Sequence, residues 1–156
     1  DPPQRLILVG GVHIAIPLVS LANMLGFEVI VIDPRRLFGT TDRFPVVSKL
    51  IQDWPQAAFD QLTITATTAI VMLTHDPKID DPALMIALDS HAFYIGALGS
   101  RKTHQKRLSR LAQQGVDQQA LDRIHAPVGL DLGASTPEEI ALAILAEIVQ
   151  VWHKRG

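Results

Sequence analysis

The sequence predicts a three-layer α/β/α fold: a Rossmann-like open parallel sheet with helices on both faces. Two observations support this fold class. Short apolar runs without polar alternation, typical of strands buried on both faces, alternate with helical segments along the 156 residues. The first run, residues 6–9, leads into a glycine turn, and a second, residues 29–32, ends on Asp33, which is the outline of a dinucleotide-binding βαβ unit. We expect a single domain over residues 1–156.

The glycine turn departs from the fingerprint G-x-G-x-x-G/A. Gly10 and Ala15 take the first and third places, but Val12 takes the second, where glycine normally lets the backbone approach a pyrophosphate. The backbone N–H groups of Gly11, Val12 and His13 could still attract an anion at the start of the following helix. The valine side chain should push a pyrophosphate outward, so the turn predicts a nucleotide fold and leaves nucleotide binding open.

Asp33 lies at the end of the second predicted strand, about 20 residues after the turn. At this place a carboxylate accepts a hydrogen bond from a ribose 2′-OH, which favours NAD over NADP. Arg35 and Arg36 follow at once and could instead hold a 2′-phosphate or another anion through paired hydrogen bonds. A solvated turn without ligand is the third interpretation.

The remaining elements follow from apolar periodicity and from turn residues. We expect strands at residues 6–9, 27–32, 49–53, 69–73, 93–97 and 126–128. We expect helices at 12–25 and 55–62, from Pro82 onward, at 101–114, in a short segment ending at 124, and after Thr136, with a loop at 37–47. Gly26 and Gly115 stand where two of these helices need a left-handed residue after their last turn.

The last helix has the strongest signals at its start. Thr136 is its expected N-cap, Pro137 its first residue, and Glu139 completes a capping box. Its apolar residues form a wide stripe that packs either on the sheet or on a partner. The stripe consists of Ile140, Ala141, Ile144, Leu145, Ile148, Val149 and Trp152.

Two further turns should lie beside the first one, because the carboxyl ends of parallel strands meet at one edge of a sheet. The first contains Thr74, His75 and Asp76. An imidazole there suits hydrogen bonding to a heterocycle or proton transfer, and a structural hydrogen bond is the alternative. Neighbouring strand residues point to opposite faces, so we do not expect His75 and Asp76 to form a catalytic pair.

The second of these turns contains Gly99, Ser100 and Arg101. Ser100 is the expected cap of a helix that opens with basic residues. Positive charge at a helix N-terminus opposes the helix dipole, which predicts a bound anion. Farther along this helix the basic residues, Lys106, Arg107 and Arg110, are interpreted as a solvated face.

Composition excludes several classes of protein and site. The 14 basic and 16 acidic residues give a net charge of −2, which predicts no nucleic-acid partner and no anionic membrane partner. The sequence has no cysteine, hence no disulfide and no thiolate nucleophile. No apolar run approaches the roughly 20 residues that span a bilayer, and we expect a cytoplasmic protein. The histidines lack metal-ligand spacing, so we predict no metal site.

Several segments together resemble the C-terminal Rossmann domain of the XdhC/CoxI family. They are residues 73–76, 94–101, 124–134 and 136–141. Members of this family are accessory proteins for xanthine dehydrogenase and related molybdenum hydroxylases. The resemblance implies that the chain binds the molybdenum cofactor, protects it while a cysteine desulfurase supplies its terminal sulfur, and passes it to the apo-enzyme.

Two departures from the family pattern define the alternatives. The family turn reads G-A-G-H-V-A, whereas Val12 replaces the second glycine here, and the family's N-terminal domain with its cysteine-containing segment is absent from this sequence. The resemblance therefore implies the C-terminal domain of a longer family member. The alternatives are an NAD(P)-dependent oxidoreductase and a ligand-free scaffold that forms a homodimer through the apolar C-terminal helix.

Overall fold

The computed structural model describes residues 3–35, 47 and 49–155. Within these residues the strands form one parallel sheet in the order β3-β2-β1-β4-β5-β6. The strands are β1 (Arg5–Val9), β2 (Glu28–Ile32), β3 (Lys49–Ile51), β4 (Thr68–Met72), β5 (Tyr94–Ala97) and β6 (Ile124–His125). The helices are α1 (Ala15–Met24), α2 (Pro55–Asp60), α3 (Pro77–Leu88), α4 (Arg101–Gln113), α5 (Gln118–Leu121) and α6 (Pro137–Lys154). The predicted Rossmann-like α/β/α fold is confirmed.

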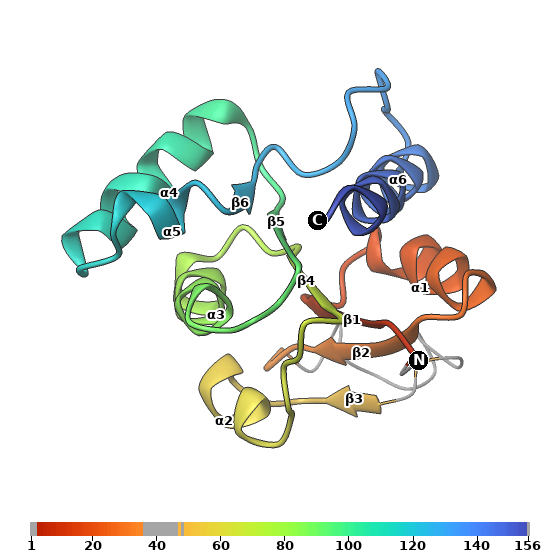
Figure 1. Ribbon diagram of the computed structural model, residues 1–156, viewed down its shortest axis with the longest axis horizontal. Helices are drawn as coiled ribbons and strands as arrows, with labels where there is room; N and C mark the ends of the chain where they lie inside the picture. Colours follow the sequence, from red (N-terminus) through yellow and green to blue (C-terminus); the bar gives the residue numbers. More distant parts are fainter. Residues whose placement is uncertain (1–2, 36–46, 48, 156) are drawn as a thin grey trace.

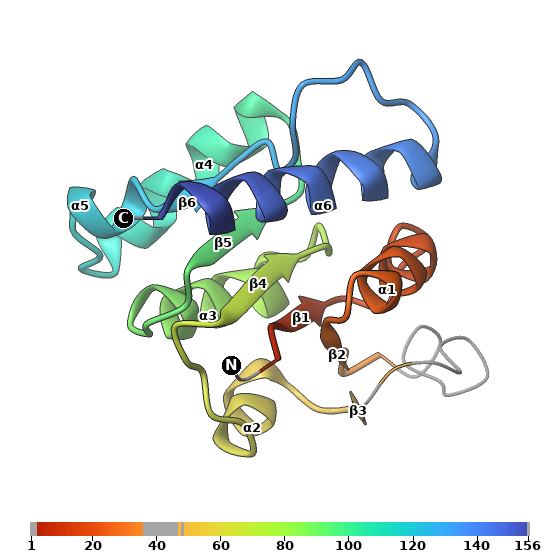
Figure 2. The same cartoon turned by 45° about the vertical axis from the view of Figure 1, so that its right-hand side comes forward.

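Helices cover both faces of the sheet (Figures 1 and 2). Helices α1 and α6 lie on one face, and α2 and α3 lie on the other, with α4 and α5 beside α3. Successive residues of β1 point to opposite faces. Leu6 and Leu8 pack toward α1 and α6, whereas Ile7 and Val9 pack toward α2 and α3. Because both faces are covered, β1, β2 and β4 are apolar from their second residue onward, which is the pattern that made them recognisable in the sequence.

The direction of chain progression across the sheet reverses at β1, which pairs with both β2 and β4. Val9 is in register with Ile32 on one side and with Met72 on the other. Backbone hydrogen bonds extend past the strand ends, because Gly10 N donates to Ile32 O (2.8 Å) and Leu73 N donates to Val9 O (2.8 Å). The turns that follow these three strands therefore start side by side, at the switch point where such sheets bind ligands.

Two helices begin at other residues than predicted. Helix α1 starts at Ala15, because residues 11–14 form a turn without a side-chain cap. Helix α3 starts at Pro77 rather than at Pro82, which lies inside it. Asp76 caps α3 by accepting the Lys78 N–H (3.0 Å), so Asp76 and Pro77 were the N-cap and first-turn signals. The predicted start at the second proline was wrong because the first proline already opens the helix.

The last strand also differs from its prediction at 126–128. Strand β6 comprises Ile124 and His125, and the segment predicted to complete a short helix at 124 instead enters the sheet. Pro127 has no N–H to donate, so the ladder does not continue through it. Of the predicted loop at 37–47, only residue 47 lies within the described residues. The strand predicted at 49–53 and the helix at 55–62 are present as β3 and α2.

Helix α6 is built as the sequence predicts. Thr136 Oγ1 accepts the Glu139 N–H (3.1 Å), and Glu139 Oε1 accepts the Thr136 N–H (3.2 Å), which completes the capping box. The inner part of its stripe, including Ile144 and Ile148, is fully buried against α1 and the sheet. The inner part of the apolar stripe is thus used inside the molecule. Across the described residues, no helix is long and apolar enough to span a membrane.

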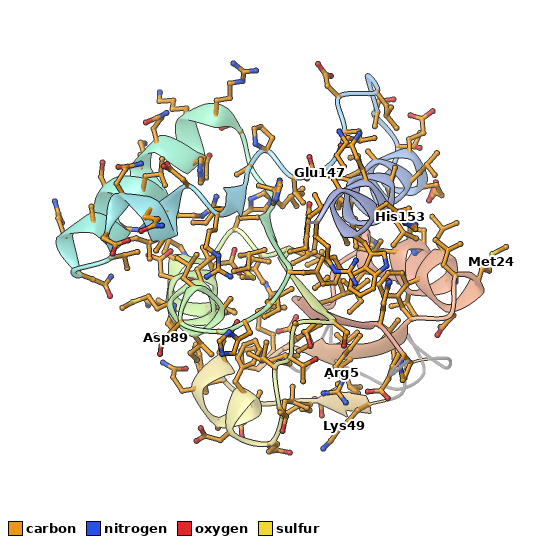
Figure 3. All side chains as sticks on the ribbon, in the orientation of Figure 1. Arg5, Met24, Lys49, Asp89, Glu147 and His153 are labelled. Carbon is orange, nitrogen blue, oxygen red and sulfur yellow. The ribbon has the colours of Figure 1, made fainter. Side chains whose placement is uncertain are left out.

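Side chains fill the space between the sheet and the helices (Figure 3). Glu147 lies on the inner side of α6, whereas Met24 projects from the end of α1 and is 81% exposed. Two neighbouring clefts open at the carboxyl edge of the sheet.

Candidate functional site

A cleft of about 560 Å³ lies at the switch point between β1 and β4. Its apolar walls come from Val12, Ile14, Leu73 and Leu98, and its polar groups come from the turns after β1, β2 and β4. The polar side chains are those of His13, Arg35, Thr74, His75 and Asp76. Small-molecule sites commonly have this size and this combination of apolar walls with a few polar groups.

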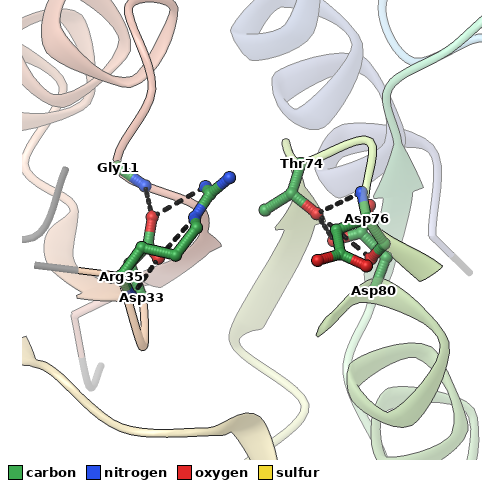
Figure 4. Close-up of polar contacts among 6 residues, drawn as sticks. All are labelled: Gly11, Asp33, Arg35, Thr74, Asp76 and Asp80. Atoms are coloured by element: carbon green, nitrogen blue, oxygen red, sulfur yellow. Dashed lines mark hydrogen bonds and ion pairs between the residues drawn. The ribbon is translucent and has the colours of Figure 1, made fainter. Parts of the chain in front are cut away.

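One wall of the cleft is organised around Asp33, which is completely buried. Its carboxylate accepts hydrogen bonds from Gly11 N (2.7 Å), Arg35 N (2.9 Å), and the Arg35 side-chain atoms Nε and Nη2 (both 2.9 Å). The bond to Asp33 raises the pKa of Arg35. A carboxylate has about four lone-pair sites, and here all are used to hold the first turn against β2 (Figure 4). Asp33 therefore acts in this conformation as a structural anchor.

The opposite wall is organised around Thr74, whose hydroxyl is also buried (Figure 4). Thr74 Oγ1 donates to Asp80 Oδ1 (2.7 Å) and accepts the Asp76 N–H (3.1 Å). Asp76 caps α3, so one of its carboxylate oxygens, Oδ1, accepts a backbone hydrogen bond. His75 is exposed at the cleft, and its ring makes no hydrogen bond within the described part of the chain. His75 is thus the side chain of this turn that is available to a ligand.

The two walls touch at Gly10. This residue has φ +116°, a conformation that favours glycine. A Cβ atom there would lie 2.7 Å from Thr74 Cγ2. The first glycine of the fingerprint is therefore required both by the turn and by the close approach of the second turn.

The third predicted turn lies on the same edge but mostly outside this cleft. Ser100 caps α4 by accepting the Thr103 N–H (3.1 Å), as predicted, after Gly99 at φ +136°. Arg101 lines a second cleft of about 500 Å³, formed with residues 127–134 and α6. Leu98 borders both clefts. The sequence therefore placed all three turns on one edge, and the structure divides them between two neighbouring clefts.

Glu147 holds the loop of the second cleft. Its Oε1 accepts the Tyr94 hydroxyl (2.5 Å) and the Gly129 N–H (3.1 Å). Burial and the neighbouring carboxylate raise the pKa of Tyr94, so the phenol stays protonated and donates. Glu147 was not predicted from the sequence, although an acidic residue beside the apolar stripe of a helix can indicate a polar contact inside the protein.

Two buried charges on the α3–α4 side were also missed. Arg107 was interpreted as part of a solvated face, but it is only 3% exposed, and its Nη2 donates to Leu98 O (3.0 Å). Asp80 is 2% exposed, and burial raises its pKa to about 7. The signal for Asp80 was its place between Ile79 and Ala83 on the apolar side of a helix. Among the described residues, no three His, Asp or Glu side chains gather closely enough to hold a metal ion.

Comparison with known families identifies the fold more narrowly. Residues 6–148 match the family described as the XdhC Rossmann domain. The chain belongs to this family. Its match covers the first turn, both clefts and most of α6, so the sites described above are parts of an XdhC Rossmann domain.

Two relatives show the kinds of protein in which similar domains occur. The chain is 34% identical over 150 residues to a probable xanthine dehydrogenase subunit of Bacillus subtilis, a match that covers 96% of the chain and 43% of the relative. It is 36% identical over 104 residues to the molybdenum cofactor insertion chaperone PaoD of Escherichia coli, a match that covers 67% of the chain and 32% of PaoD.

A solved structure, called a xanthine dehydrogenase from Bacillus halodurans, is similar over 100% of the chain and 44% of its own length. The TM-score is 0.86 and the identity is 32%. The chain thus spans less than half the length of each of these proteins.

Proposed function

We propose that this chain is the cofactor-handling domain of an accessory protein that matures a molybdenum hydroxylase, such as xanthine dehydrogenase. In this proposal the cleft between β1 and β4 receives the organic part of the molybdenum cofactor as cargo. The family assignment and the named functions of the two relatives support the maturation role. The observation that carries the proposal is the cleft itself, which lies at the switch point and is bounded by residues from neighbouring strand-end turns.

The lining of the cleft fits a flat heterocycle with a charged substituent. Val12 and Leu73 offer apolar surface for the faces of a ring. His75 offers hydrogen bonds to ring nitrogen or oxygen atoms, because its imidazole has no partner among the described residues. Arg35 adds positive charge at the same cleft, with Asp33 fixing its orientation. These residues would recognise the organic cargo, since none of them needs to act as a ligand to the metal.

The further steps of maturation need other proteins. The chain has no cysteine, so a terminal sulfur would come from a partner, which we propose to be a cysteine desulfurase. The acceptor would be the apo form of the hydroxylase, in the cytoplasm where the loaded cofactor is inserted. A homodimer through the α6 stripe is not part of the proposal, because the inner part of that stripe packs on α1 and the sheet.

A direct test measures binding of a fluorescent pterin phosphate by titration. His75→Ala should weaken binding by about 5- to 30-fold, the usual effect of losing one or two hydrogen bonds at a site. Lys102→Ala is the matched control, because Lys102 is an exposed cation on α4 that lines neither cleft. Equal affinity of the wild type and His75→Ala would contradict the proposal.

Two further measurements identify the ligand and how far it extends. Arg101→Ala should weaken binding only if the ligand extends past Leu98 into the second cleft, since Arg101 lines that cleft alone. NADH is the competing ligand. NADH binding that is tighter than pterin binding and is accompanied by turnover of a small substrate would replace the proposed function by that of an NAD(P)-dependent oxidoreductase.

A further inference from the structure

A small cavity of about 80 Å³ lies between α3 and α4, beneath the main cleft. It shares His75 and Pro77 with that cleft, and the rest of its lining comes from the two facing helices. Helix α4 contributes Thr103, Lys106, Arg107 and Arg110, and α3 contributes Asp80. The α4 residues have the 3- and 4-residue spacing that places side chains on one face of a helix. The cavity is therefore lined by a cationic helix face opposite one buried carboxyl group.

Two buried polar atoms of this lining have no partner. Among the residues that the structure describes, the only buried side-chain nitrogen or oxygen atoms without a hydrogen bond are Asp80 Oδ2 and Arg107 Nε. Their residues are 2% and 3% exposed and line the same cavity. Buried polar groups in proteins nearly always have a partner, so two orphans at one cavity indicate a bound group that satisfies both.

The charges around the cavity favour an anion. Arg110 is already neutralised, because its Nε and Nη2 donate to the two carboxylate oxygens of Asp81 (2.7 and 3.1 Å). Of the other residues that line the cavity, Lys106 and Arg107 carry positive charge and Asp80 is the single carboxyl group. Arg107 makes no direct hydrogen bond to Asp80, since its other nitrogens contact Leu98 O and His104 Nδ1. The cavity is thus left with an excess of positive charge.

Most of the polar groups at the cavity can donate. Arg107 Nε–H and the Lys106 ammonium are donors, and the Thr103 hydroxyl, which accepts from Ser100 Oγ (3.0 Å), keeps its own proton. Asp80 accepts from Thr74 through Oδ1, so its unpartnered Oδ2 can carry a proton. The volume equals the liquid volume of two or three water molecules, which also suits one tetrahedral oxyanion.

We propose that this cavity is an oxyanion site, which takes a sulfate- or phosphate-like group and binds it together with a proton on Asp80. The ionised carboxylate would repel the anion, whereas the carboxylic acid would donate a hydrogen bond to it. Because burial raises the pKa of Asp80 to about 7, the binding-competent acid predominates at pH 6 and is the minor form at pH 8. The site goes beyond the proposed function and does not require the molybdenum cofactor.

Several charged or titratable groups face Asp80 and could modify this titration. They are Arg35, His75, Asp76, Asp81, Lys106, Arg107 and Arg110, with His104 behind Arg107. Burial and Arg107 lower the pKa of His104, which favours the neutral form of this ring. His75 and His104 are the two histidines near Asp80, and the experiment must separate their effect from that of Asp80.

The test uses sulfate, whose charge does not change between pH 6 and pH 8, with binding measured by equilibrium dialysis. If only the protonated site binds, the dissociation constant of the wild type should be about tenfold weaker at pH 8 than at pH 6. Asp80→Asn keeps the acceptor for Thr74 and removes the titration. It should bind sulfate with the same affinity at both pH values.

Variants on α4 locate the site. Lys106→Gln should weaken sulfate binding at least fivefold, whereas Lys102→Gln, an exposed cation on the same helix outside the cavity, should bind like the wild type. Circular dichroism of both variants checks that they fold.

Glycerol 3-phosphate at pH 6 identifies the source of the anion. Binding of sulfate alone indicates a free anion, and binding of both indicates the phosphate group of a larger ligand; either supports an oxyanion site.

Three results would overturn the inference. They are absence of sulfate binding, wild-type affinity in Lys106→Gln, and a pH dependence that survives in Asp80→Asn, which would show that a group other than Asp80 controls binding. A pterin phosphate that still binds the cleft when sulfate fails to bind would leave the proposed function standing, so the two failures are distinguishable.

Discussion

The two helix layers that cover the sheet differ in what holds them in place. The layer of α1 and α6 packs on the sheet through apolar side chains such as Leu18, Ile144 and Ile148, all fully buried. The layer of α3 and α4 also has an apolar core, but it buries Asp80, Asp81 and Arg107 between its helices. One layer is an ordinary hydrophobic interface, and the other contains charges that are costly to remove from water.

The position of these charges explains the difference. Asp80 is bonded to Thr74 at the wall of the main cleft, and Arg107 is bonded to Leu98, which borders both clefts. The polar layer therefore connects directly to the ligand-binding edge. The apolar layer reaches the same edge through Ile140 and Ala143 of α6, which line the second cleft without charge. We infer that the second layer gives up some stability in exchange for a binding site.

The largest expected effect is on the apolar layer. Ile144→Ala removes a side chain with no exposed surface, and such truncations typically cost about 2–5 kcal/mol through lost burial and the remaining cavity. Urea unfolding followed by circular dichroism measures the change, and the sulfate affinity of the folded variant should stay unchanged. A loss below about 1 kcal/mol would mean that the buried side chain of Ile144 contributes little to the stability of this layer.

In the polar layer, a substitution of Asp80 should increase the stability of the protein, whereas the substitution of Ile144 decreases it. Because the pKa of Asp80 is raised from 3.8 to about 7 in the folded protein, the native state holds an additional proton between these values. The free energy of unfolding should therefore fall as the pH rises from about 4 to about 7. Asp80→Asn removes this penalty and should be more stable than the wild type at pH 8, by on the order of 2 kcal/mol.

The control for Asp80→Asn is to measure the stability difference between this variant and the wild type at two pH values. Thermal unfolding at pH 8 and at pH 4 should show stabilisation at the higher pH and nearly equal stability at the lower one, where Asp80 is protonated in the native state. Equal destabilisation at both pH values would mean that Asp80 and Arg107 act as a net favourable ion pair, and the contrast between the two layers would then be smaller than proposed.

The contrast between the apolar and the polar layer also explains which features could be predicted from the sequence. The central strands and α6 were predicted closely, because burial on both faces gives continuous apolar runs and because the cap at Thr136 is a local signal. Arg107 was misplaced because helical periodicity counts an arginine as polar and exposed. Its burial depends on α3, which is distant in sequence and which was itself predicted to start at the wrong proline.

In the candidate site, too, some features could be predicted from the sequence and others depend on contacts between distant residues. The sheet edge was predictable because parallel strands must end together, so the turns at Gly10, Thr74 and Ser100 were correctly placed on it. The division into two clefts was not predictable, since it depends on Leu98 and on the loop that Glu147 holds. The anchoring role of Asp33 was missed for a similar reason, because the bond from the Gly11 N–H exists only once the turn is folded.

A smaller effect is expected at the cap of α6. Thr136→Ala removes the hydroxyl that accepts the Glu139 N–H, and loss of such a cap usually costs about 1 kcal/mol. Thr136→Ser keeps the hydroxyl and should be close to the wild type in chemical denaturation. If both variants lose the same stability, the methyl group rather than the cap would be responsible.

The smallest expected effect is on the NADH affinity when Val12, in the turn after β1, is replaced. Val12→Gly restores the second glycine of the fingerprint and removes a side chain from the cleft. We nevertheless expect NADH affinity to rise less than about threefold, because Asp33, the residue that would bind the ribose, already accepts four hydrogen bonds from Gly11 and Arg35. Fluorescence titration of NADH measures the change. A gain of tenfold or more, about 1.4 kcal/mol, would identify Val12 as the obstacle, and the dinucleotide would then compete with the pterin as the ligand of the main cleft.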